Sequence, residues 1–139
     1  MTDLCSQYKK INENIIVFHN KNETPYITVP HLHSQYEIYY NIHGAKGFML
    51  NGSFFKCNKK DLIVIPKVQT HKVLVRKNIE YERCIINVSD YIIDLIEILC
   101  NSKDELLWLK GTDEKIPQMV NLSDEQHYFF MNLIDNYPK

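Results

Sequence analysis

A succession of short apolar or alternating runs, each ended by turn residues, fills the chain from Ile15 to Val88. Asn51-Gly52 stands between two such runs, and this dipeptide is the usual sequence of a type I′ hairpin turn. Strand-length runs at this spacing favour an antiparallel sandwich or small barrel over a parallel sheet with crossover helices. The sequence therefore predicts a mainly β fold over about residues 15–88.

After Val88 the apolar residues recur at helical spacing. Ser89 is placed to cap a helix, and two capping boxes follow, SKDE at residues 102–105 and SDEQ at residues 123–126. Gly111 would end the helix that the first box opens. We expect a helical C-terminal part over about residues 89–139, within one domain of 139 residues.

The charges of the chain are balanced, with 16 Lys and Arg against 17 Asp and Glu and a net charge of −1. This balance gives no electrostatic footprint for nucleic acid, so we do not expect the chain to bind DNA by itself. No apolar run approaches the roughly 20 residues of a membrane span. The four scattered cysteines form no CxxC pair, which is typical of reduced thiols in a cytoplasmic protein.

The segment HLHSQYEIYYNIHG, residues 31–44, gathers several side chains able to bind a metal or a ligand. On a strand, alternation places the polar members on one face and the apolar side chains on the other. In a closed barrel, that polar face is expected inside. Its members are His31, His33, Glu37, Tyr39 and Asn41.

A second segment, DLIVIPKVQTHKV, brings His71 onto a neighbouring strand. With His31, His33 and Glu37, it would complete a set of ligands for a divalent transition metal. Two other interpretations stay open. The same groups would hydrogen-bond an organic effector in a pocket, or His71 and Glu37 would only satisfy each other.

The spacing of these residues resembles that of the cupin motifs. The HxH of residues 31–33, with Glu37 and Gly44, follows the first motif, and Pro66 with His71 resembles the core of the second. The resemblance implies a cupin-like antiparallel β-barrel, that is, a jelly roll.

A wider stretch, including YERCIINVSDYI, is similar to the N-terminal sensor domain of AraC-type transcriptional regulators and covers about residues 15–137. The resemblance implies an effector-binding barrel and a helical pair for homodimerisation. It also implies a downstream helix-turn-helix domain as the only contact with DNA. No membrane partner is expected, because the sequence lacks an apolar run of spanning length. The alternative is a stand-alone metal-dependent cupin enzyme of the oxygenase or isomerase type. Lys60 and Val68 stand where cupins commonly place glycine, which favours the sensor.

Beside the histidines, we expect Tyr39 and Asn41 to line the effector pocket. Arg83, in the apolar segment YERCIINV, would contact a carboxylate of the effector, because a guanidinium suits bidentate recognition. The alternative for Arg83 is an ion pair with Glu80 or Glu82. No role is assigned to the histidines outside the motifs, which are His19, His43 and His127.

The last helix carries more apolar residues than the barrel needs and is aromatic along one side, and it would share a seam with the first helix. Core packing is the alternative for some of them. We expect the remainder to form a homodimer seam. The predicted set is Ile92, Leu95, Ile96, Leu99, Phe129, Phe130, Leu133, Ile134 and Tyr137.

Overall fold

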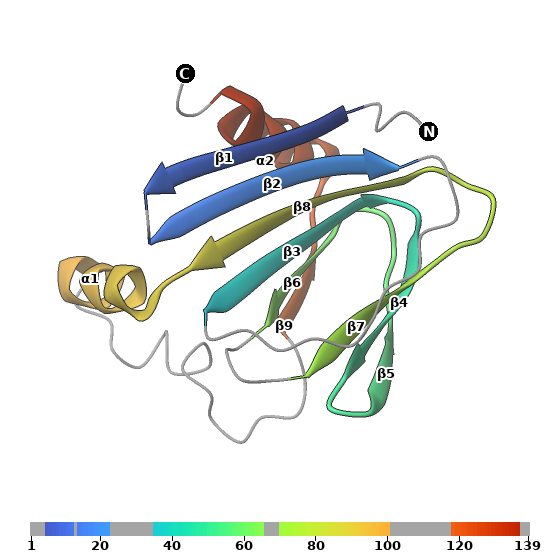
Figure 1. Cartoon of the computed structure of the whole chain (residues 1–139), viewed down its shortest axis with the longest axis horizontal. Helices are drawn as coiled ribbons and strands as arrows, with labels where there is room; N and C mark the ends of the chain where they lie inside the picture. Colours follow the sequence, from blue (N-terminus) through green and yellow to red (C-terminus); the bar gives the residue numbers. More distant parts are fainter. Residues whose placement is uncertain (1–4, 13, 23–34, 66–69, 101–117, 137–139) are drawn as a thin grey trace.

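The computed structural model describes residues 5–12, 14–22, 35–65, 70–100 and 118–136, and it shows two antiparallel sheets and two helices (Figure 1). In chain order the elements are β1 (Cys5–Asn12), β2 (Ile15–Asn22), β3 (Tyr36–His43), β4 (Ala45–Leu50), β5 (Ser53–Lys56), β6 (Asp61–Ile65), β7 (His71–Val75), β8 (Tyr81–Val88), α1 (Asp90–Cys100), β9 (Gln118–Asn121) and α2 (Asp124–Asn136).

The strands form a six-stranded sheet, in the order β1-β2-β8-β3-β6-β9, and a three-stranded sheet, in the order β5-β4-β7. The two sheets pack face to face, because Tyr39 and Ile63 of the large sheet share a buried core with Phe48 and Leu50 of the small one. The predicted mainly β fold with C-terminal helices is confirmed. Among the described strands no pairing joins the sheets, so the expected barrel is open, with separate edges on each sheet.

Gly44 lies where the chain leaves β3 of the large sheet and enters β4 of the small one. Its φ is +104°, and a Cβ at this position would overlap the Glu80 carbonyl oxygen and lie 2.8 Å from Tyr81 Cα. The Gly44 carbonyl accepts a hydrogen bond from the Arg76 amide at 2.9 Å. Both the φ angle and the close backbone therefore require glycine here.

The predicted hairpin at Asn51-Gly52 is confirmed. These two residues connect β4 to β5, with φ angles of 48° and 84°, as a type I′ turn requires. Behind the turn, the Phe54 ring lies directly over Gly47, where any Cβ would collide with the ring. The glycine thus lets an aromatic side chain lie flat across β4.

β1 was not predicted, since the first expected strand began at Ile15. It pairs along β2, from Cys5 opposite Lys21 to Asn12 opposite Ile15. Its sequence, CSQYKKIN, lacks an apolar run, and such polar sequences are common in strands at the edge of a sheet. The strand region therefore begins earlier than about residue 15.

Both helices pack on the face of the large sheet that points away from the small sheet (Figure 1). Ile93 of α1 packs with Tyr36 and Val88. Ile134 of α2 packs with Val17 and a group of side chains from β3 and β8. No helix in the described ranges is long and apolar enough to cross a membrane.

The capping box predicted for α2 is present. The Ser123 amide donates to Gln126 Oε1 at 2.9 Å, and the Gln126 amide donates to Ser123 Oγ at 3.1 Å. Lys60 Nζ lies 2.6 Å from Asp124 Oδ1, and its hydrogen bond lowers the pKa of that carboxyl. Lys60, at a position where cupins commonly place glycine, has a φ of +68°. The first predicted box and Gly111 lie outside the described residues.

Cys57 and Cys84 are free and buried, as expected for reduced thiols. Burial, followed by the charge of Asp61, raises the pKa of the Cys57 thiol to about 12. Burial also raises the pKa of Cys84 far above its ordinary value. Since the thiolate is the reactive form, both thiols are unreactive at neutral pH.

Candidate functional site

β3 divides its side chains between the two faces of the large sheet, as the alternation of its sequence predicted. The Tyr39 ring lies between the sheets, with its centroid 5.7 Å from that of Phe48. The Tyr40 ring points the other way, with its centroid 4.8 Å from that of Phe130 in α2. The face toward the small sheet therefore carries Glu37, Tyr39 and Asn41, and it forms the candidate site.

Glu37 and His71 meet across the gap between the sheets. Glu37 Oε2 lies 3.2 Å from His71 Nε2, and both side chains are almost fully buried. The His71 ring stacks on Phe48, with centroids 5.8 Å apart and planes 8° from parallel. This contact between Glu37 and His71 links β3 to β7.

The structure places two of the four predicted metal ligands, since His31 and His33 lie outside the described residues. No group of three or more His, Cys, Asp or Glu side chains that could hold a metal occurs within the described ranges. A catalytic zinc site, for example, takes three protein ligands. The metal site at these four residues therefore stays a prediction.

Arg83 lies further along the same interior face. It pairs opposite Asn41, four residues from Glu37 on β3, which is about 13 Å along an extended strand. The guanidinium carbon lies 4.5 Å from the centroid of the Tyr81 ring, and Nη1 donates a hydrogen bond to Asn22 Oδ1. Arg83 is only 6% exposed, so its charge is held inside the protein.

The acidic neighbours of Arg83 in the sequence bind other residues. Glu82 Oε2 lies 2.6 Å from His19 Nε2 on the opposite face of the sheet, and Glu80 pairs with Lys21 at 3.3 Å. Consecutive strand residues point to opposite faces of a sheet. Arg83 and Glu82 are therefore neighbours in the sequence, but their side chains lie on opposite faces of the large sheet.

Two tyrosine hydroxyls on this interior face bind each other. Tyr39 and Tyr81 are linked through their hydroxyl oxygens at 2.7 Å. Burial, followed by the influence of Tyr81, raises the pKa of Tyr39 well above its ordinary value. Tyr39 therefore stays neutral and able to donate a hydrogen bond at all physiological pH values.

Asn41, on the same face, forms hydrogen bonds with the backbone. Its Nδ2 donates to the Asn58 carbonyl at 2.9 Å, and its Oδ1 accepts from the Ala45 amide at 3.2 Å. These bonds hold the start of β4 and the turn before β6. Contact between Asn41 and an effector stays a prediction.

Two histidines without an assigned role connect α2 to the sheet. His19 lies between Glu82 and Asp135, with Nδ1 2.8 Å from Asp135 Oδ1. His127 Nδ1 lies 2.7 Å from the Tyr40 hydroxyl, whose pKa burial raises to about 12. On its strand, His19 shares a face with Val17, but no local pattern identifies partners more than 60 residues away.

The helix residues predicted for the dimer seam divide into two groups. Ile134, Phe130 and Ile92 pack against the sheet, and Tyr137 lies outside the described residues. The remaining members are exposed to different degrees: Leu95 38%, Ile96 39%, Leu99 74%, Phe129 67% and Leu133 52%.

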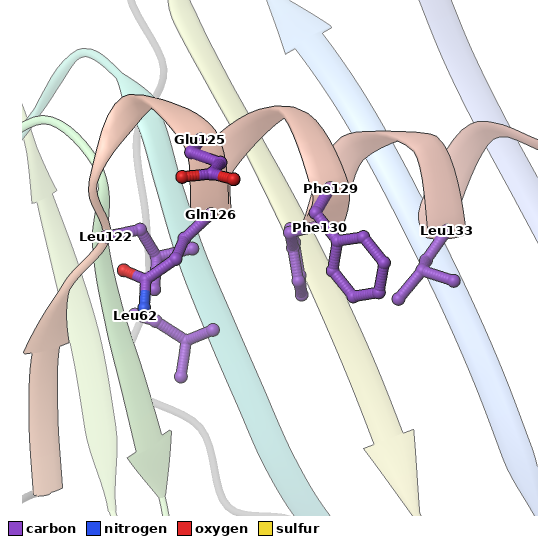
Figure 2. A pocket seen from close by; sticks show the side chains of 7 residues that line it. All are labelled: Leu62, Leu122, Glu125, Gln126, Phe129, Phe130 and Leu133. Carbon is purple, nitrogen blue, oxygen red and sulfur yellow. The ribbon is translucent and has the colours of Figure 1, made fainter.

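Beside α2 lies a groove of about 500 Å³ on the outer face of the large sheet (Figure 2). Its walls are mostly apolar, with one carboxylate and one amide at the N-terminal end of the helix. The lining residues are Leu62, Leu122, Glu125, Gln126, Phe129, Phe130 and Leu133. The groove is separated from the interior site by the sheet itself.

Two solved structures of ToxT from Vibrio cholerae share this fold. ToxT bound to an unsaturated fatty acid matches with a TM-score of 0.68 and 9% identity, over 94% of this chain and 49% of ToxT. ToxT bound to (E)-4-(8-methylnaphthalen-1-yl)but-3-enoic acid matches with a TM-score of 0.67 and 10% identity, over 91% of this chain and 49% of ToxT. The chain thus spans about half the length of ToxT.

A cupin 2 conserved barrel domain protein from Salinispora arenicola matches with a TM-score of 0.52 and 15% identity, over 68% of this chain and 82% of that protein. At such identities these likenesses concern the fold alone. A comparison with curated protein sequences gives no significant match.

The sequence model of the AraC-like ligand binding domain covers residues 14–96. This range extends from the residue before β2 into α1, and so includes strands β2 to β8, which carry the interior site. Because the match covers more than half of the residues and the fold agrees with it, the chain belongs to the AraC-like ligand binding domain family.

Proposed function

We propose that this chain is the effector-sensing and dimerisation part of an AraC-type transcription regulator, which controls a downstream helix-turn-helix domain. The observation that carries the proposal is the buried row of polar groups between the sheets. The row runs from the Glu37–His71 pair through Tyr39 to Arg83, whose guanidinium lies against the ring of Tyr81. Membership of a ligand-binding family supports the use of this interior as a pocket.

The effector we propose is a carboxylic acid with an apolar body. A guanidinium carries five N–H donors in a planar fork, so Arg83 can bind Asn22 and a carboxylate together. The surrounding side chains, among them Phe48 and Ile85, suit an apolar body. Both ligands named for ToxT are carboxylic acids, which agrees with this chemistry.

Sensing requires that the effector bind one arrangement of the domain more tightly than another. We propose that the two arrangements differ in how the sheets and helices contact each other or the downstream domain. Such a regulator works in the cytoplasm, where the DNA lies. It performs no chemistry on the effector, and DNA contact belongs to the downstream domain.

The test is a calorimetric titration of the purified chain with oleate, below its micelle concentration, with methyl oleate as the matched ligand that lacks the charge. We expect saturable binding of oleate, and binding at least about ten-fold weaker for the ester, because an ionic hydrogen bond contributes about 1.5–3 kcal/mol. Equal binding of oleate and methyl oleate would mean that Arg83 does not bind the carboxylate of the effector.

The second candidate function is a metal-dependent cupin enzyme, favoured by the short Glu37–His71 contact. Purified protein that carries near-stoichiometric transition metal, loses it in His71→Ala and fails to bind oleate would establish this candidate instead.

We also propose a homodimer that uses the exposed apolar residues of the helices. Phe129 and Leu133 are one helical turn apart on α2 and form an exposed stripe beside the groove of Figure 2. Leu133→Glu should raise the dimer dissociation constant at least about ten-fold, since a charge would enter an apolar seam. Sedimentation velocity over a range of concentrations measures this change.

Tyr128→Glu is the matched control, because Tyr128 is at least as exposed on α2 as Leu133 but points away from the stripe of residues 129 and 133. It should leave the dimer intact. If Leu133→Glu and the native chain sediment alike, α2 does not form the seam.

A further inference from the structure

The positive charges of the chain are concentrated in one part of the fold. Residues 42–79 contain half of the 16 Lys and Arg residues but only one of the 17 Asp and Glu residues, Asp61. This range contains all three strands of the small sheet. Five of these eight basic residues lie on or just after strands of the small sheet, so the near-zero net charge averages over a basic region: Lys46, Lys56, Lys72, Arg76 and Lys77.

The strand register shows which side chains share the outer face of the small sheet. Phe54 pairs with Met49, which pairs with Lys72, and Lys56 pairs with Gly47, which pairs with Leu74. Directly paired residues lie on the same face of an antiparallel sheet. The inner face is occupied instead by Phe48, Phe55 and Val73, which belong to the core. The outer face is thus apolar at its centre and basic at its sides.

This face is open to solvent. The Phe54 ring, which lies over Gly47, is 56% exposed. Met49, Lys72 and Leu74 line a hollow of about 390 Å³ together with Gly52, Thr70 and His71. Lys46, Lys56, Arg76 and Lys77 are also exposed on or just after these strands.

The positive charges of the face are not neutralised within the described part of the chain. Lys56 and Lys72 have no ion pair there, and Lys46, Arg76 and Lys77 have none either. In contrast, Lys21 and Lys60, which lie on other parts of the surface, bind Glu80 and Asp124. An apolar patch rimmed by unpaired charges of one sign is typical of a surface that binds a partner of opposite charge.

We propose that the outer face of the small sheet binds an acidic amphipathic helix of a protein partner. Its apolar stripe would cover Phe54, Met49 and Leu74, and its carboxylates would lie beside Lys56 and Lys72. A nucleic-acid backbone is the less suitable occupant, because phosphates offer nothing to cover an exposed apolar centre.

The probe is a fluorescein-labelled helical peptide of about 18 residues, with leucines along one side and glutamates elsewhere. Binding to the native chain is followed by fluorescence anisotropy. We expect Lys72→Glu and Phe54→Ser each to weaken binding at least about ten-fold. Lys59→Glu is the matched control, because Lys59 is exposed in the turn near β9, away from this face, and it should change the affinity less than about two-fold.

Three results would overturn the proposal. The first is equal binding of the peptide to the native chain and to Lys72→Glu. The second is tighter binding of duplex DNA that Phe54→Ser leaves unchanged, which would identify a surface for polyanions. The third is loss of self-association in sedimentation of Lys72→Glu and Phe54→Ser, which would identify a second copy of the chain as the occupant. Circular dichroism of each variant verifies that the fold is retained.

Discussion

Arg83→Met is expected to weaken oleate binding by about 30-fold or more, since removing one partner of a buried charge pair costs about 2–5 kcal/mol. The reason is the position of the guanidinium: it is buried on the interior face, beside Tyr81 and Asn22, where a carboxylate would be shielded from water. Methionine keeps the length and the apolar stem of the side chain but removes the charge and all donors. Calorimetric titration of both proteins measures the difference.

Lys21→Met provides the matched control for this prediction. Lys21 also carries one positive charge on the large sheet, but it pairs opposite Glu82 on the other face and binds Glu80. Its loss should change oleate affinity less than about two-fold, because Lys21 lies on the face away from the interior site and its half-exposed pair contributes little. If both variants bind equally well, the effector does not contact Arg83, whereas unfolding of Arg83→Met, visible by circular dichroism, would require the milder Arg83→Lys.

Gly44→Ala is expected to reduce the free energy of unfolding by about 3 kcal/mol or more, which is a large fraction of the stability of a domain this size. Two effects add at this residue. A φ of +104° is strained for any residue with a side chain, and the new methyl group would overlap the Glu80 carbonyl oxygen. That oxygen belongs to the backbone just before β8, so it cannot rotate away. Urea unfolding followed by circular dichroism measures the loss.

Gly52→Ala separates the two effects. Gly52 has a φ of +84°, but nothing lies within 4 Å of the position that a Cβ would occupy. Its substitution should therefore cost only about 1–2 kcal/mol, the conformational part alone. Equal losses of unfolding free energy at the two glycines would mean that the backbone near Glu80 relaxes. The connection from β3 to β4 would then not depend on glycine at position 44.

Local signals in the sequence predicted the parts of the fold that local physics determines. Asn51-Gly52 specifies a two-residue turn, SDEQ specifies the start of α2, and the alternation of YEIYYNI places Tyr39 and Tyr40 on opposite faces. In each case the residues that interact are close in the sequence. The interior position of Glu37 followed from the same alternation, whereas His71 was expected on a neighbouring strand and lies on β7 of the other sheet.

Features that depend on distant partners were harder to predict. α1 has apolar residues on almost every side, so helical periodicity could not show that Ile93 is buried while Ile98 and Leu99 are exposed. β1 was missed because its pairing with β2, and not its own composition, makes it a strand. The basic outer face of the small sheet was missed for another reason. The net charge of the chain is a sum over all residues, so it does not show that basic residues are concentrated in one part of the fold.

β8 places Arg83 and Glu82 on opposite faces of the large sheet, one toward the interior and one toward His19 and Asp135 of α2. If Arg83 binds the effector, as proposed above, the binding residue and the residue facing α2 are joined by a single peptide bond. Because the peptide unit between Glu82 and Arg83 is rigid and planar, one of these residues cannot shift along the strand without the other. An effector that shifts Arg83 along the strand axis would therefore shift Glu82 as well. The contact of Glu82 with α2 through His19 would then change when the effector binds, without any rearrangement of side chains in the core.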